Sequence, residues 1–244
     1  MQKSIMGAVW FCLLYFIGCH FITAQEIYVP KTKEYLMRLL KDPSIPLSAI
    51  DTSNITDMSR LFENSNRKDF SGIETWNVSN VTDMNYMFSH ARFFNHNINE
   101  WSVSNVISMS GMFYEAVNFN QPLDKWDVSH VRFMFGVFFN AKAFNQPLNS
   151  WNVSNVEGMG SMFCGADNFN QPLDRWDTHN VLTMRDMFHS AKSFNQDINM
   201  WNINKVKNKT KILYRSGMQK VPSWYKKEFQ EEQKIDAMKK EEYR

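Results

Sequence analysis

The hydrophobic and polar positions of the chain repeat with a fixed period. Tryptophan marks the period most clearly, because six tryptophans follow one another at intervals of 25 residues: Trp76, Trp101, Trp126, Trp151, Trp176 and Trp201. A constant period of about 20 to 50 residues is the signature of repeats that stack on one another. The sequence therefore predicts one elongated repeat domain over residues 50–206, with six to seven repeats, instead of two globular domains.

Each repeat contains two different hydrophobic patterns. A β-branched residue usually lies two positions after the tryptophan, as Val78 follows Trp76, and this alternation predicts a strand. Eight residues after each tryptophan the spacing changes to i, i+3, i+4, i+7, as in Met84, Met87, Phe88 and Ala91, which predicts a two-turn helix. We therefore predict an α/β solenoid with one short parallel strand and one short helix in each repeat.

A Phe-Asn pair follows each predicted helix, and its asparagine does not vary: Asn95, Asn120, Asn145, Asn170 and Asn195. These side chains could form a ligand site. Stacked asparagines can also satisfy the backbone groups that tight bends leave unpaired in the core. We interpret them as a structural, hydrogen-bonded ladder.

The segments that flank the repeats have the features of caps. An end repeat exposes a hydrophobic face that has to be covered. Residues 25–49 contain an apolar stripe at helical spacing and are predicted to form an N-terminal cap helix. Residues 207–244 are predicted to form a basic, charged C-terminal cap and tail helix.

The first 24 residues have the pattern of a signal peptide. Lys3 precedes an apolar run from Ile5 to Ile17. One predicted cleavage follows Ala24. The other treats residues 1–18 as a lipoprotein signal and leaves Cys19 as a lipidation site, and an uncleaved membrane anchor is a third alternative. We expect a secreted or cell-surface protein, with lipid attachment at its N-terminus as one alternative.

Composition and motifs narrow the function. A hydrophobic fraction of 43% excludes a disordered chain. Cys12 and Cys19 lie in the targeting segment, so Cys164 has no partner for an intramolecular disulfide. From Lys205 onward the chain has 12 Lys and Arg against 6 Asp and Glu, but these are interleaved, so we expect no nucleic-acid partner. Neither a recurrent metal-ligand spacing nor a catalytic motif occurs, and we expect no enzyme, metal or cofactor.

The residues on either side of each tryptophan differ between repeats, and alternation turns them outward. They would form columns on an extended surface of the kind that solenoids use for binding. The candidate partner-binding residues are Glu100, Lys125, Asp127, Ser150, Arg175 and Asp177. The alternative is that they are ordinary solvated residues.

The repeat unit, Phe-Asn-Gln-Pro-Leu-x-x-Trp-Asp-Val-Ser, followed by the Met-x-x-Met-Phe-x-x-Ala segment, resembles the BspA-like leucine-rich-repeat surface proteins. That group includes a domain of unknown function abundant in mycoplasma surface lipoproteins. The resemblance implies a leucine-rich-repeat-like solenoid and a noncatalytic role in adhesion, with a protein or glycan of another cell or of the envelope as partner. The alternative is a structural envelope protein whose basic tail contacts membrane or wall. We expect a monomer.

Overall fold

The computed structural model describes residues 26–242 of the chain. The predicted signal peptide and Cys19 lie outside these residues. The regular elements, in chain order, are the α-helix α1 (Lys33–Leu40), the 3-10 helices η1 (Leu47–Ala49), η2 (Ile73–Thr75) and η3 (Ser223–Tyr225), and the α-helix α2 (Lys226–Glu242). Among the described residues, neither α-helix has the length and apolar composition needed to span a membrane.

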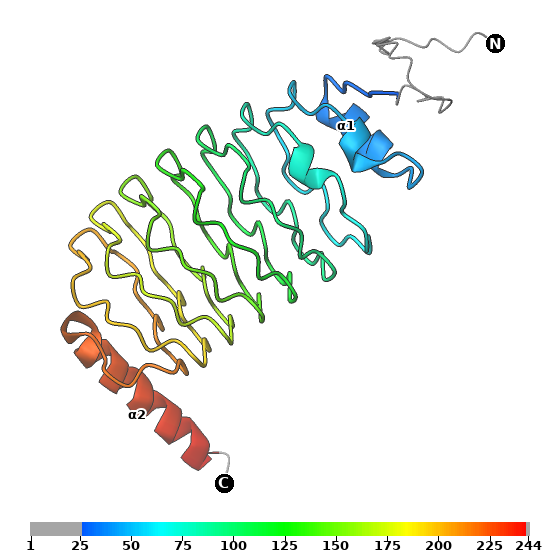
Figure 1. Cartoon of the computed structure of the whole chain (residues 1–244). Helices are drawn as coiled ribbons and strands as arrows, with labels where there is room; N and C mark the ends of the chain where they lie inside the picture. Colours follow the sequence, from blue (N-terminus) through cyan, green and yellow to red (C-terminus); the bar gives the residue numbers. More distant parts are fainter. Residues whose placement is uncertain (1–25, 243–244) are drawn as a thin grey trace.

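Between α1 and α2 the chain winds through similar coils that lie side by side along one axis (Figure 1). Single-residue parallel β-bridges join each coil to the next, and seven coils are linked in this way: Asp57, Asp83, Ser108, Phe133, Gly158, Thr183 and Asn208. Consecutive bridge residues are 25 positions apart, except for the first pair, which is 26 apart. Each coil therefore corresponds to one sequence repeat.

The predicted helix of each repeat is not present, since no α-helix lies between α1 and α2 in the described chain. In the first complete repeat, Tyr86 and His90 have φ angles of 56° and 57°, and equivalent residues of the other coils are also left-handed. Left-handed residues four positions apart divide the segment into tight turns. Four-residue turns put positions i, i+3, i+4 and i+7 on one side, just as an α-helix does. Over only eight residues, the hydrophobic spacing therefore cannot distinguish a helix from a series of tight turns.

The predicted strand at the tryptophan is also absent, and the coils are joined seven residues further along, through the segment expected to be helical. There the backbone N–H groups alternate between two kinds of partner. The N–H groups of Met84 and Tyr86 donate to the backbone carbonyls of Ser108 and Ser110 in the next coil, both at 2.9 Å. The N–H of Met87 instead donates to the carbonyl of Met84 in its own coil, at 3.2 Å. Bonds between coils thus replace the i to i−4 bonds of a helix.

Aromatic side chains run through the core in columns. Phe113, Phe138 and Phe163 are fully buried, and their ring centroids are 5.7 and 5.5 Å apart from coil to coil. The buried indole N–H of each repeat tryptophan donates to a carbonyl of the preceding coil, as Trp151 does to Leu123 at 2.9 Å. Aromatic packing and the buried indole hydrogen bond of each coil therefore add to the backbone bonds that hold the coils in register.

The C-terminal segment closes the stack by supplying the partners that another coil would provide. The indole N–H of Trp224 donates to the Ile198 carbonyl at 3.2 Å, as a repeat tryptophan would. In the last coil, the N–H of Lys211 donates to the Glu232 carboxylate at 2.7 Å, and the N–H of Ile212 donates to the buried Tyr225 hydroxyl at 3.0 Å. Side chains of η3 and α2 thus satisfy backbone donors at the end of the stack.

Gly111 and Gly136 offer a matched test of the left-handed turns, with φ angles of 64° and 58°. A Cβ at Gly136 would lie 3.6 Å from its nearest neighbour, so Gly136→Ala should cost only the conformational penalty of about 1–2 kcal/mol. A Cβ at Gly111 would lie 2.4 Å from the Tyr86 ring, and Gly111→Ala should cost about 1–3 kcal/mol more. Denaturant unfolding of both variants measures the difference, and equal losses would contradict the close packing at Tyr86.

Candidate functional site

The columns of residues beside the tryptophans lie on the surface, and all six candidate binding residues are exposed. Lys125 and Glu100 of adjacent coils form an ion pair with each other. The carboxylates after the tryptophan hold local turns, since Asp127 accepts from the N–H of Ser129 at 3.0 Å and Asp177 from that of His179 at 3.1 Å. Hydrogen bonds from Ser129 lower the pKa of Asp127. None of the six lines the groove described below.

The asparagines after the helix-like turns are joined from coil to coil. The backbone N–H groups of Asn120, Asn145, Asn170 and Asn195 each donate to the side-chain oxygen of the preceding asparagine, at 2.9 Å in every case. The N–H of Gln219 continues the series by donating to Asn195, also at 2.9 Å. The side chains are half-buried or exposed, so they join the coils at the surface and not inside the core, where the sequence had suggested them.

Asn145→Ala is expected to lower the free energy of unfolding by about 1–2 kcal/mol, because the N–H of Asn170 loses its acceptor and the amide of Gln171 keeps only the backbone carbonyl of residue 145. Asn168→Ala, at an exposed asparagine of the next coil, is the control and should change stability by less than about 0.5 kcal/mol. Chemical denaturation measures both. Equal stability of the two variants would show that the ladder does not hold the coils together.

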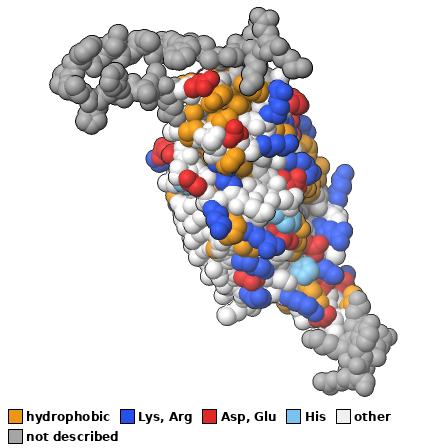
Figure 2. Space-filling view, turned by 90° about the vertical axis from the view of Figure 1, so that its right-hand side faces the viewer, with side chains coloured by type: hydrophobic (Ala, Val, Ile, Leu, Met, Phe, Trp, Pro, Cys, Tyr) orange, Lys and Arg blue, Asp and Glu red, His pale blue; other side chains and the backbone are white. Residues whose placement is uncertain are grey.

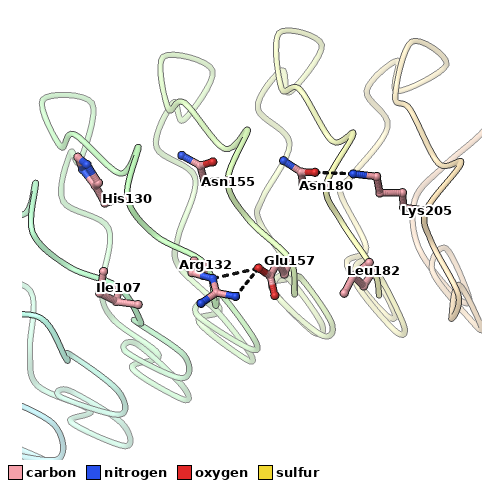
Figure 3. A pocket seen from close by; sticks show the side chains of 8 residues that line it. All are labelled: Ile107, His130, Arg132, Asn155, Glu157, Asn180, Leu182 and Lys205. Carbon is pink, nitrogen blue, oxygen red and sulfur yellow. Dashed lines mark hydrogen bonds and ion pairs between the residues drawn. The ribbon is translucent and has the colours of Figure 1, made fainter.

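A groove crosses five coils on another part of the surface (Figure 3). Its volume is about 610 Å³, and two parallel rows of side chains line it. The +4 row lies four residues after each tryptophan and contains His130, Asn155, Asn180 and Lys205; the +6 row lies six residues after it and contains Ile107, Arg132, Glu157 and Leu182.

The local chain path explains why the two rows face outward. The residue between them, such as Val131 or Val156, is a fully buried valine that points into the core, so its two neighbours point away. Backbone hydrogen bonds along the +6 row hold the coils together. The backbone N–H of Arg132 donates to the carbonyl of Ile107, and that of Glu157 donates to the carbonyl of Arg132, both at 2.9 Å. The groove is therefore carried by a hydrogen-bonded surface of the stack.

The amides of the +4 row have fixed orientations. The Nδ2 groups of Asn155 and Asn180 donate to the carbonyls of Ser129 and Ser154 in the preceding coils, at 2.7 and 2.8 Å. These contacts identify the nitrogen side of each amide and leave its oxygen as an acceptor. The oxygen of Asn180 accepts from Lys205 at 2.7 Å (Figure 3). The row thus presents oriented amide groups in the two coils that carry Asn155 and Asn180.

A charged pair lies between two apolar side chains in the +6 row. Arg132 forms two hydrogen bonds with the Glu157 carboxylate, at 2.9 and 2.6 Å. Ile107 and Leu182 lie on either side of this pair and are 40% and 36% exposed. On the face shown in Figure 2, charged side chains of both signs lie among hydrophobic ones along the length of the stack. The groove can thus make ionic, hydrogen-bonding and apolar contacts.

The metal-ligating side chains and the free cysteine of the described residues bear on the chemistry available to the chain. Within residues 26–242, no three His, Cys, Asp or Glu side chains come together in a way that could hold a metal ion. Burial raises the pKa of the Cys164 thiol to about 11, so the thiol is protonated at neutral pH and is a weak nucleophile.

The residues of the groove were not among the predicted binding residues, all of which lie next to a tryptophan. A usable signal was present, since the constant valine five residues after each tryptophan has neighbours of changing chemistry. The Asn residues of the +4 row, such as Asn155, come just before the segment for which a helix was predicted, where an Asn side chain can cap the first N–H groups. The structure has no helix there, and these amides join neighbouring coils.

Stacked coils with one sequence repeat each define a repeat protein, and a comparison with family models supports this class. The model described as "Mycoplasma protein of unknown function, DUF285" matches residues 37–151 and again residues 122–224. The chain belongs to this family. No curated protein and no solved structure matches it.

Proposed function

We propose that the protein is a noncatalytic, BspA-like cell-surface protein whose leucine-rich-repeat-like solenoid binds an extended protein or glycan in the groove. The observation that carries the proposal is the continuity of the groove over five coils. Repeat proteins commonly recognise partners through such extended surfaces. Export through residues 1–24, with attachment at Cys19 as the alternative to free secretion, would put this surface outside the cell.

The pattern of variation within the chain supports binding by the groove. Positions that face the core keep nearly the same residue in every coil, because they have to pack against their equivalents. The +6 row instead changes from Ile107 to Arg132, Glu157 and Leu182. Packing does not require the residue type to differ from coil to coil, whereas a row that contacts successive, different parts of one ligand does.

A pair of double variants tests the proposal on the full chain. Arg132→Glu with Lys205→Glu reverses two charges in the groove, and Lys125→Glu with Arg175→Glu reverses two exposed charges in the columns beside the tryptophans. Arrays of glycans and of extracellular proteins first identify a saturable ligand of the unaltered chain. We expect the groove variant to bind it at least tenfold more weakly and the column variant to bind normally. The opposite order would assign binding to the columns.

An envelope structural role is the alternative proposal, and the exposed basic side chains of the C-terminal segment favour it. Lys226, Lys227 and Lys234 of α2 are exposed. In this case the coils would act as a spacer while residues 205–244 contact an anionic surface. Sedimentation with anionic lipid vesicles separates the two roles, since binding that needs residues 205–244 and ignores the groove variant supports the structural role.

A further inference from the structure

The groove has the chemistry and the spacing to select one class of extended ligand. We infer that it binds an acidic polysaccharide that runs along the axis of the stack, with about one sugar over each coil. This inference rests on the proposed function, because it names the ligand class of the same groove. Three features of the groove carry it: the spacing of its rows, their hydrogen-bonding groups and their uncompensated charge.

The spacing of the rows follows from the backbone hydrogen bonds between coils. These bonds continue along the +6 row, where the backbone N–H of Leu182 donates to the carbonyl of Glu157 and that of Lys207 to the carbonyl of Leu182, both at 2.8 Å. Parallel chains bonded in this way are about 4.8 Å apart, whereas an extended peptide repeats its side chains on one face about every 6.7 Å. Such a peptide would lose register by roughly 2 Å at each coil. A pyranose unit in an extended glycan advances by nearly the coil spacing.

The hydrogen-bonding groups of the groove suit a polyhydroxyl chain. Asn155 uses one N–H for Ser129 and keeps an N–H and its oxygen for a ligand, and the two free groups match the donor and acceptor of a hydroxyl. The Arg132–Glu157 pair adds charged donors and acceptors in the same groove. Ile107 and Leu182 supply aliphatic surface for the C–H faces of sugar rings. Each coil therefore offers a contact that a sugar can use.

The charge of the groove indicates an acidic ligand. Glu157 is the only carboxylate among the lining residues, and its ion pair with Arg132 neutralises it. Lys205 bonds to the neutral amide of Asn180, so its charge is not matched by the one carboxylate that lines the groove. Lys207, next to Leu182 in the +6 row, is exposed at the same end. A carboxylate or sulfate group of a glycan would complement this basic end.

Fluorescence anisotropy with labelled oligosaccharides tests the inference on the full chain. Hyaluronan oligosaccharides of two to ten sugars carry a carboxylate on alternate sugars, and neutral chito-oligosaccharides of the same lengths are the matched ligands without charge. We expect binding of hyaluronan to strengthen up to about five or six sugars, to change little beyond that length, and to weaken with added salt. Lys205→Glu should weaken it at least tenfold, whereas Arg175→Glu, the same charge change outside the groove, should have little effect.

Several outcomes would overturn the inference. Equal binding of the neutral series would remove the acidic class, and affinity independent of length would remove the alignment along the stack. Tighter binding of poly-L-glutamate than of hyaluronan of similar length would assign the groove to acidic peptides. If no oligosaccharide binds but the groove double variant still loses a protein ligand, the proposed function stands and the glycan assignment fails. If that variant loses no ligand of any kind, both fail.

Discussion

Replacing Phe138 by alanine is expected to lower the free energy of unfolding by about 3–5 kcal/mol. Phe138 is fully buried in the middle of the stack. Its ring lies 5.7 Å from Phe113, 5.5 Å from Phe163 and 3.9 Å from Phe144. Truncation would open a cavity that touches three coils, and the neighbouring coils could not close it without breaking their backbone bonds.

The control for this prediction is Phe93→Ala, because the Phe93 side chain is 47% exposed and belongs to no column. It should cost less than about 0.5 kcal/mol. Denaturant unfolding followed by tryptophan fluorescence measures both variants. A stack that is interrupted in the middle could unfold in two parts, so a smaller denaturant slope for Phe138→Ala would be a second sign of the same effect. Similar losses for the two variants would contradict the packed aromatic column.

Tyr225→Ala is expected to have an effect of similar size at the C-terminal end, about 3–5 kcal/mol. Tyr225 is fully buried against the last coil. Its hydroxyl accepts from the N–H of Ile212 at 3.0 Å and donates to Glu232 at 2.7 Å, and Glu232 also accepts from the N–H of Lys211. Loss of the ring would uncover Ile212 and Leu213. Hydrogen exchange should show that the last coil opens first, while exchange that rises equally in all coils would argue against a local cap.

The same tyrosine predicts loss of stability at alkaline pH. Burial and the hydrogen bond to Glu232 raise the pKa of Tyr225 above its ordinary value of 10.0. A group with a raised pKa in the folded state stabilises fully below its unfolded pKa, and this contribution is lost as the pH rises above about 10. Tyr225→Phe should therefore be less stable than the natural chain at neutral pH, because it lacks both hydrogen bonds.

Comparing the natural chain with Tyr225→Phe isolates the contribution of the Tyr225 hydroxyl to the pH dependence of stability. The stability difference between the natural chain and Tyr225→Phe should shrink above about pH 10, because the variant has no hydroxyl to ionise there and the other tyrosines titrate in both. Urea unfolding at a series of pH values measures the difference. A constant difference across that range would show that the Tyr225 hydroxyl is not buried in the folded protein.

Most of the core was evident from the sequence. Trp151, Met159, Phe163 and Ala166 belong to columns that the 25-residue period predicts, and all four are buried. The need for caps followed from the exposed ends of a stack. The N-terminal part of the chain has α1, and the C-terminal part has Trp224 and Tyr225 at positions where they contact the last coils. Trp224 was hard to identify as an equivalent of the repeat tryptophans, because it follows Trp201 by 23 residues and not 25.

The path of the backbone could not be obtained in the same way. Hydrophobic spacing reports which side chains turn inward, and Met84, Met87, Phe88 and Ala91 are all buried as their spacing requires. It does not report where the N–H groups find acceptors. In a helix the acceptor is four residues back along the chain, whereas here the acceptor of Phe88 is Met112 of the next coil, at 2.9 Å. The acceptor exists only once the coils have stacked.

The sequence by itself thus determined the repeat, its length, the residues of the core and the membership of a repeat class, because each of these depends on the order of residues along one chain. Tertiary structure alone decided the turns, the hydrogen bonds that join asparagines of neighbouring coils, and the groove lined by the +4 and +6 rows. The physical reason is common to all three. Each arises from contacts between residues about 25 positions apart, and those contacts form only when one coil lies against the next.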